Sequence, residues 1–250
     1  MNIANIKRKF EKSIYTYDAN AHAQREIANK LHSLVLRLCE YKPAKIFEIG
    51  TGTGLLTKKI VESFPESVYM INDINEKIEL LMPLLFKGTK YTFLPGDAQL
   101  IPYPTDVNLI ISSSTIQWFD NLDNFAQKAH KSLSGGGYMF LSTFGENNLK
   151  EIREITGSGL NYATIDTICE IFSPLFDILK IEAEEITVKF ATPADILEHL
   201  RNTGVNATNN ATLRSRAELL HFCNNYATKF SHNGNVTLTY NPIYIALRKK

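Results

Sequence analysis

The sequence predicts an α/β fold, a doubly wound parallel sheet with helices on both faces, and three observations lead to it. Five short apolar runs have the composition of buried strands: 45–49, 68–72, 91–94, 107–112 and 138–143. Helical spacing of apolar residues separates several of these runs, at 55–64, 76–86 and 122–133. A glycine-rich turn, Gly50-Thr51-Gly52-Thr53-Gly54, follows the first run. Strands and helices that alternate in this way form parallel sheets, because each crossover helix packs on the sheet that its strands build.

Two helices are predicted ahead of the sheet. Apolar residues recur every three or four positions in the first segment, at Ile3, Ile6, Phe10, Ile14 and Tyr17. The second helix covers about 20–40 and ends at Tyr41-Lys42-Pro43, because proline cannot continue a helix. We expect residues 1–41 to form a helical lid and residues 42–190 to form the core that binds the cofactor.

The C-terminal part follows a different pattern. Helices are predicted at 165–171, 193–202 and 213–230, and strands at 176–190 and 236–247. The last two helices fall between these two strands. We therefore expect 191–232 to be a helical insertion and 233–250 to return to the sheet as its final strand.

Bulk composition excludes several classes of function. A formal net charge of +1 over 250 residues gives no electrostatic reason to expect nucleic acid. No apolar run approaches the roughly 18 residues of a membrane span, and residues 1–10 lack the apolar core of a signal peptide. The three cysteines and six histidines show no metal-ligand spacing, so no metal site is predicted. We expect a cytoplasmic protein without a membrane or nucleic-acid partner.

The glycine turn is typical of a nucleotide-binding site between a strand and a helix. Glycine leaves no Cβ in the way of a ligand, and the free N–H groups of the next helix face it. The spacing G-x-G-x-G differs from the dinucleotide fingerprint G-x-G-x-x-G, which holds a pyrophosphate. Glu48, two residues before Gly50, would repel a pyrophosphate but suits S-adenosylmethionine (SAM), which carries a sulfonium and an ammonium. The turn therefore favours a SAM methyltransferase over a dinucleotide enzyme, with contacts from Glu48, Gly50, Thr51, Gly52 and Gly54.

The ends of the next three strands supply further candidates, because ligands of doubly wound sheets bind where the carboxyl ends of the strands meet. Asp73 lies about 23 residues after Gly50, a spacing that suits an acid bound to ribose hydroxyls. It could instead cap the following helix. The predicted cofactor residues at these strand ends are Asp73 and Ile74, Asp97 and Ala98, and Ser112 and Ser113.

Motifs outside the sheet make the chain similar to one family. They are Tyr15-x-Tyr17-Asp18-x-x-Ala21-x-x-Gln24, Ser113-x-x-x-Gln117-Trp118-Phe119, Leu200-Arg201-x-x-Gly204 and Leu238-Thr239-Tyr240-Asn241-Pro242. With the strand ends, they resemble the malonyl-acyl-carrier-protein O-methyltransferases of biotin synthesis over residues 6–249. The chain departs from that family in having Glu48 where Asp is usual and Thr51 where Cys is usual. The resemblance implies a seven-stranded Rossmann-like methyltransferase sheet with an antiparallel last strand pair, SAM as the cofactor, and methylation of the malonyl carboxylate.

The resemblance also implies roles for particular residues. Asp97 would bind the adenine amino group, and Tyr17 and Gln24 of the lid would cover the cofactor. A carboxylate is already a nucleophile at pH 7, so the site needs a side chain that orients it and no general base. The candidates for this positioning are Tyr17, Gln117 and Trp118. Acyl carrier proteins are acidic, and the candidates for docking one are Arg201, Arg214, Arg216 and Lys229.

Other interpretations stay open from the sequence. A methyltransferase for a small carboxylic acid or a quinone precursor would share the cofactor residues. A SAM-binding sensor or partner subunit would share them without turnover. Packing in the core is the ordinary alternative for Tyr17, and a solvated surface is the ordinary alternative for the four basic residues.

Overall fold

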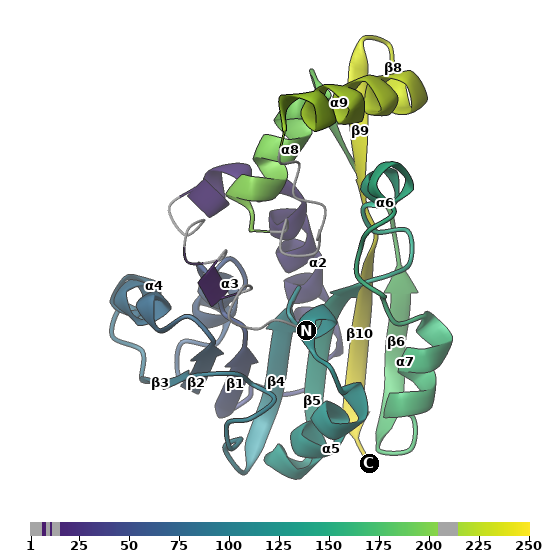
Figure 1. The fold of residues 1–250 in the computed structure, drawn as a ribbon. Helices are drawn as coiled ribbons and strands as arrows, with labels where there is room; N and C mark the ends of the chain where they lie inside the picture. The colour runs from purple at the N-terminus through teal and green to yellow at the C-terminus, as the bar shows by residue number, and fades with distance from the viewer. Residues whose placement is uncertain (1–6, 9–10, 12–15, 205–214) are drawn as a thin grey trace.

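The computed structural model describes residues 7–8, 11, 16–204 and 215–250, and a seven-stranded sheet forms its centre. The strands are β1 (Lys45–Ile49), β2 (Val68–Asp73), β3 (Tyr91–Pro95), β4 (Val107–Ser113), β5 (Leu133–Phe144), β6 (Phe176–Ala183) and β10 (Pro242–Lys249). Their order is β3-β2-β1-β4-β5-β10-β6 (Figure 1). β1 to β5 pair in parallel, whereas β10 runs antiparallel to both β5 and β6. The predicted α/β methyltransferase sheet is therefore confirmed.

Helices cover both faces of this sheet, because its strands bury side chains on both sides. They are α2 (His22–Leu38), α3 (Thr57–Ser63), η1 (Glu76–Leu81), α4 (Met82–Phe86), η2 (Ile116–Trp118), α5 (Leu122–Ser132), α6 (Lys150–Thr156) and α7 (Ile165–Phe172). Neighbouring residues of β1 belong to opposite cores: Ile46 packs with α2, α3 and α4, and Phe47 packs with α5 and α7. The switch between β1 and β4 places the first βα turn at the crevice of the sheet.

The predicted first helix is described only in part. Residues 16–20 are helical and lead directly into α2, which buries Ala23, Ile27 and Leu31 as expected from their spacing. Ile3, Ile6, Phe10 and Ile14 lie outside the described residues. No helix in the described ranges has the length and apolar character needed to cross a membrane.

The C-terminal region differs from the prediction of two long strands. Residues 176–190 form β6 and a separate β7 (Ile186–Phe190), and residues 236–247 are divided between β9 (Asn235–Tyr240) and β10. The two breaks lie side by side, because the Asn241 side chain donates to the Glu184 carbonyl (2.8 Å) and the Glu184 N–H donates to the Pro242 carbonyl (3.1 Å). The strand pair β6 and β10 of the large sheet therefore ends where the strand pair β7 and β9 begins.

Beyond these breaks, a second sheet forms with the order β7-β9-β8, where β8 is Ser231–His232. Helices α8 (Pro193–Asn202) and α9 (Arg216–Phe230) pack on it, and the whole element projects past the end of the large sheet (Figure 1). Capping boxes at Thr192 and Ser215 fix the starts of both helices. The segment between β6 and β10 is thus a small α/β element, which contains α8 and α9 of the predicted insertion together with the strands β7, β8 and β9.

Candidate active site

The glycine turn after β1 adopts backbone angles that favour glycine. Gly50, Gly52 and Gly54 have φ angles of +70°, +54° and +91°. A Cβ on Gly50 would collide with Thr115, and a Cβ on Gly54 would collide with Leu85, so these two glycines allow close packing. A Cβ on Gly52 would meet no protein atom within 4 Å. Gly52 is therefore the position at which a ligand can approach the backbone.

A cavity lies at this turn and is called the first cavity. Its walls are the turn, the ends of β2, β3 and β4, and parts of the lid and η2. Of the predicted cofactor residues it gathers Tyr17, Gln24, Glu48, Gly50, Thr51, Gly52, Asp73, Ile74, Asp97, Ala98 and Ser113. It also includes Ser114, which follows the predicted Ser113, and residues that sequence reasoning did not select, among them Asn75, Gln99, Thr115 and Phe119.

Two predicted cofactor residues do not line the first cavity. Gly54 faces Leu85, as its packing shows. Ser112 is buried, and its hydroxyl donates to the Ile49 carbonyl at 2.9 Å. That bond ties β4 to β1, so Ser112 supports the sheet while its neighbour Ser113 reaches the cavity.

Asp73 holds the cavity together through both carboxylate oxygens. Oδ2 accepts from the Gly52 N–H and Oδ1 from the Asn75 N–H, each at 2.8 Å. The residue that caps η1 is Asn75, whose side chain accepts from the Lys77 N–H, so the alternative that Asp73 is this cap is wrong. Burial raises the pKa of Asp73. The carboxylate thus fixes the glycine turn and still borders the cavity.

Glu48 is a buried acid with unused hydrogen-bonding capacity. Only 2% of the residue is exposed, and within the described chain its Oε2 has no hydrogen-bond partner. Burial raises the pKa of Glu48 to about 8, against smaller opposing effects of hydrogen bonds with Thr57 and Thr51. An acid in this state favours a cation, which would supply both a partner and the charge that ionises it. The residues present therefore fit SAM.

The lid is tied to the glycine turn and to the C-terminal element. The Thr53 hydroxyl donates to Asp18 Oδ1 (2.5 Å), and the Thr16 hydroxyl donates to the Asn202 carbonyl of α8 (3.1 Å). An ion pair joins Lys7 to Glu76 of η1 at 3.2 Å. These contacts hold Tyr17 over the first cavity.

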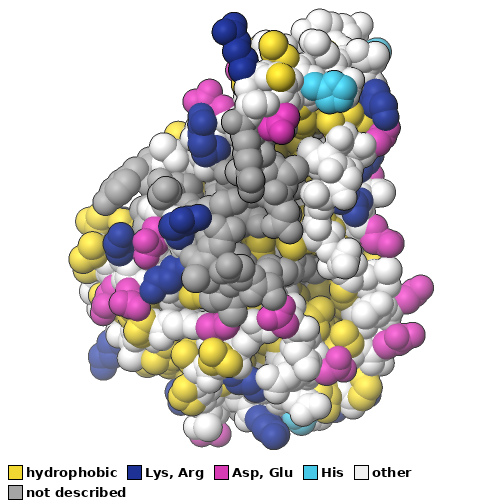
Figure 2. Space-filling model, viewed as in Figure 1, with side chains coloured by type: hydrophobic (Ala, Val, Ile, Leu, Met, Phe, Trp, Pro, Cys, Tyr) yellow, Lys and Arg dark blue, Asp and Glu magenta, His cyan; other side chains and the backbone are white. Residues whose placement is uncertain are grey.

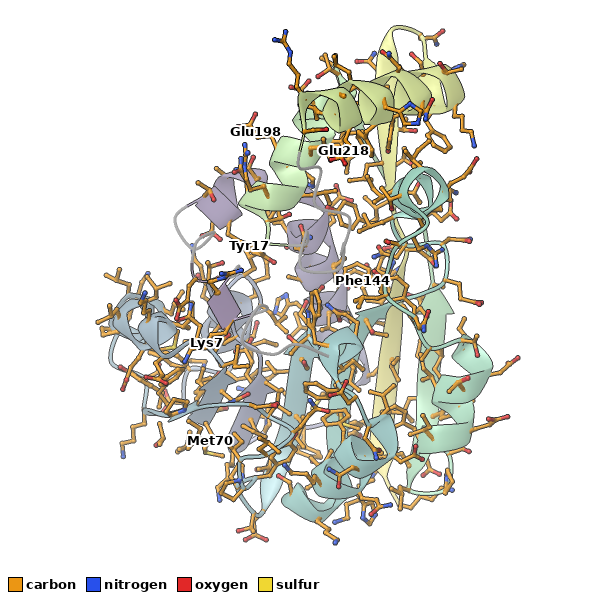
Figure 3. All side chains as sticks on the ribbon, viewed as in Figure 1. Lys7, Tyr17, Met70, Phe144, Glu198 and Glu218 are labelled. Carbon is orange, nitrogen blue, oxygen red and sulfur yellow. The ribbon has the colours of Figure 1, made fainter. Side chains whose placement is uncertain are left out.

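A second cavity adjoins the first and shares four wall residues with it: Tyr17, Gln24, Ser114 and Trp118. The remaining wall consists of Gln117, Phe144, Asn148, Leu160, Tyr162, Thr203 and Tyr240. Figure 3 labels two of its wall residues, Tyr17 and Phe144. Of the three predicted acceptor residues, Tyr17 and Trp118 line both cavities and Gln117 lines only the second.

Unpaired polar atoms gather at these two cavities. Among the described residues, seven buried side-chain atoms have no hydrogen-bond partner, and five of them belong to cavity walls: Gln24 Oε1, Glu48 Oε2, Asn75 Nδ2, Ser114 Oγ and Gln117 Oε1. Buried polar groups are normally paired, because leaving one unpaired costs about 1–3 kcal/mol. The concentration of unpaired atoms marks both cavities as ligand sites.

The floor of the second cavity is a neutral hydrogen-bonded network. The Tyr240 hydroxyl and His199 Nε2 lie 2.7 Å apart, and Gln24 lines the same cavity as Tyr240. Burial lowers the pKa of His199 to about 4 and raises the pKa of Tyr240, so both are uncharged at neutral pH. Sequence reasoning did not assign Tyr240 or Tyr162 to the site, although Tyr240 lies in one of the family motifs.

Two of the predicted docking residues, Arg201 and Lys229, each lie beside an acidic side chain. Arg201 lies 3.8 Å from Glu198, and Lys229 lies 2.8 Å from Glu154 of α6. Arg216 is exposed at the start of α9, and Arg214 lies outside the described residues. Figure 2 shows basic and acidic side chains interspersed on the face viewed there.

Comparison with known proteins agrees with this geometry. Residues 19–175 match a family model described as a methyltransferase domain. The NodS N-methyltransferase of Bradyrhizobium japonicum, solved with S-adenosylhomocysteine, is similar in fold, with a TM-score of 0.58, 13% identity and 98% of each chain covered. The YcgJ protein of Bacillus subtilis gives a TM-score of 0.61 at 15% identity, covering 89% of this chain and 99% of that protein.

Fold, cavities and family model define a SAM-dependent methyltransferase. Two curated relatives indicate which family of methyltransferases the chain belongs to. A malonyl-[acyl-carrier protein] O-methyltransferase of Bacteroides thetaiotaomicron is 36% identical, covering all of this chain and 99% of the relative. Another of the same name from Acinetobacter baylyi is 33% identical, covering all of this chain and 98% of the relative. The chain belongs to the malonyl-[acyl-carrier protein] O-methyltransferase family.

Proposed function

We propose that this chain transfers a methyl group from SAM to the free carboxylate of a malonyl group on acyl carrier protein, giving the methyl ester used in biotin synthesis. In this assignment the first cavity holds SAM and the second holds the acceptor. Their shared wall then brings the methyl group and the nucleophile together. SAM supplies an activated methyl group on a sulfonium, and the protein supplies alignment and the exclusion of water.

This proposal rests on which ionisable side chains line the second cavity. Among its described wall residues, the ionisable ones are three tyrosines: Tyr17, Tyr162 and Tyr240. Burial raises the pKa of each of them. The imidazole of His199 is bonded to Tyr240 and does not line the cavity. This wall therefore offers no base that works at neutral pH.

A cavity without a base suits an acceptor that is already ionised. A carboxylate, with an ordinary pKa near 4, is such an acceptor, whereas a phenol with a pKa near 10 must lose a proton during the reaction. The second cavity thus favours the carboxylate over a phenolic quinone precursor. Tyr17, at the shared wall, is the side chain best placed to orient that carboxylate, with Gln117 and Trp118 beside it.

The lid and the C-terminal element take supporting roles in this proposal. Tyr17 of the helical segment at 16–20 and Gln24 of α2 cover the first cavity, and Thr203, directly after α8, belongs to the wall of the second. The carrier would dock on the α8–α9 surface, through Arg201, Arg214, Arg216 and Lys229. Docking at Lys229 requires the carrier's acids to compete with Glu154 for its charge.

Mass spectrometry of malonyl-loaded carrier incubated with the protein and SAM tests the function. We expect a mass gain of one methyl ester, and a smaller rate with malonyl-coenzyme A. Acetyl-loaded carrier is the control, because it lacks the carboxylate. Methylation of a free acid or phenol without methylation of malonyl-carrier would support the small-molecule alternative. Tight SAM binding without turnover of any acceptor would support a sensor.

A further inference from the structure

Tyr162 lies in the wall of the second cavity. It lines the second cavity and not the first, whereas Tyr17 lines both. The residue stands in the connection between α6 and α7, and its hydroxyl contacts Asn148, which precedes α6. Tyr17 and Tyr162 can therefore contact two different parts of one acceptor molecule.

Hydrogen-bond directions around Tyr162 can be worked out from a backbone group. The Asn241 N–H donates to one side-chain atom of Asn148 at 3.2 Å, and a backbone N–H can only donate. That atom must be Oδ1, so the other is Nδ2, which donates to the Tyr162 hydroxyl at 2.7 Å. The Tyr162 oxygen thus accepts, and its proton is left to donate. No acceptor for that proton is found among the described residues.

The electrostatic surroundings keep this proton on Tyr162 and strengthen it as a donor. Burial raises the pKa of Tyr162 to about 12, so the hydroxyl is protonated at neutral pH. The hydrogen bond from Asn148 and the positive charge of Arg153 act in the opposite direction on that pKa. Arg153 packs its side chain against Gly159, and its Nε is buried without a partner. A nearby cation polarises the O–H without itself lining the cavity.

We propose that the Tyr162 hydroxyl donates a hydrogen bond to the thioester carbonyl oxygen of the malonyl group, so that the enzyme recognises a malonyl thioester and not only a carboxylate. This inference rests on the proposed function. One methylene separates the two oxygen-bearing ends of malonyl, so a carboxylate at the shared wall leaves the carbonyl to the second cavity alone. A donor at the carbonyl orients the acceptor and leaves the charge of the nucleophile undiminished. Tyr162 is in this way a specificity residue that the family motifs do not include.

Two acceptors that differ only at the carbonyl test the assignment. One is malonyl-carrier, and the other is carrier bearing a 2-carboxyethyl thioether, in which a methylene replaces the carbonyl. Both present the same carboxylate to SAM. Tyr162→Phe should lower kcat/KM for malonyl-carrier by about tenfold, as for one lost hydrogen bond, and should change kcat/KM for the thioether by less than about twofold.

A second variant reverses the direction of the hydrogen bond between residue 148 and the Tyr162 hydroxyl and keeps the tyrosine. Asn148→Asp retains an acceptor for the Asn241 N–H, and its other oxygen accepts the Tyr162 proton. The preference for the thioester over the thioether should fall by about tenfold here too. Adding Tyr162→Phe to Asn148→Asp should lower that preference no further, because the same donor is already lost.

The matched control is Tyr69→Phe, which removes a buried hydroxyl that donates to the Ile60 and Phe64 carbonyls, away from both cavities. It should leave the preference between the two acceptors at the wild-type value. Equal losses with both acceptors in Tyr162→Phe, at unchanged SAM affinity, would overturn the assignment to the carbonyl. Failure of the wild-type protein to methylate malonyl-carrier would instead overturn the proposed function.

Discussion

Glu48 should release a proton when SAM binds. The pKa of Glu48 is about 8 in the folded chain, above its ordinary value of 4.5, because the carboxyl is buried. At pH 7 a group with this pKa is protonated in about nine-tenths of the molecules. The positive charges of SAM favour the ionised form of an adjacent acid. We therefore expect binding at pH 7 to release about 0.9 proton for each SAM bound.

Calorimetry in two buffers measures this release directly. The binding enthalpy at pH 7 should differ between phosphate and imidazole by about 0.9 times the difference of their ionisation enthalpies. The raised pKa of Glu48 also fixes the direction in which SAM affinity changes with pH. SAM binds the ionised form, so its affinity should rise with pH, by up to about tenfold for each unit between pH 6 and 8, and level off above pH 8.

Glu48→Gln is the matched variant, because it keeps the size of the side chain and removes its titration. The variant should bind SAM more weakly at pH 8 and show almost no buffer dependence of the enthalpy. Any release that persists would come from Asp73, whose pKa is also raised by burial. A wild-type enthalpy that is the same in both buffers, with affinity flat from pH 6 to 8, would refute the reasoning about Glu48.

Three further variants separate chemistry, lid closure and docking. Tyr17→Phe should lower turnover of malonyl-carrier roughly ten- to a hundredfold in a steady-state assay and change SAM affinity much less; equal losses of both would make Tyr17 a packing residue. Thr53→Val removes the donor to Asp18 and should speed hydrogen exchange of the lid with SAM bound, while Thr53→Ser should not. Lys229→Glu should raise KM for malonyl-carrier and leave KM for malonyl-coenzyme A unchanged; equal effects on both would place docking elsewhere.

The first cavity could be predicted from the sequence because parallel strands bring their ends together. Glu48, Asp73 and Asp97 are far apart in the chain, yet each lies at the carboxyl end of a strand of the same sheet. Once the order of strands is inferred, their side chains must meet at one edge. The glycine spacing then indicates which strand end lies closest to the ligand, and the structure places Gly52 there.

The second cavity could not be predicted in this way. Its residues come from the lid, the segment after β4 with η2, the end of β5 and the loop after it, the α6–α7 connection, the end of α8 and β9. No periodicity relates them. The small second sheet was also missed, because residues 236–247 contain no charged residue and were predicted to form one strand. What divides them is the contact between Asn241 and Glu184, which depends on the folded chain.

The neutrality of the second cavity is itself suited to the proposed reaction. Transfer of a methyl group from a sulfonium to a carboxylate brings two opposite charges together and cancels them, so polar surroundings stabilise the reactants more than the transition state. A cation in contact with the carboxylate would oppose the reaction for the same reason. In the described wall, neutral tyrosines and amides line the cavity, and Arg153 contributes its charge from behind Tyr162. Hydrogen bonds that orient the acceptor give alignment without stabilising the charges that must disappear.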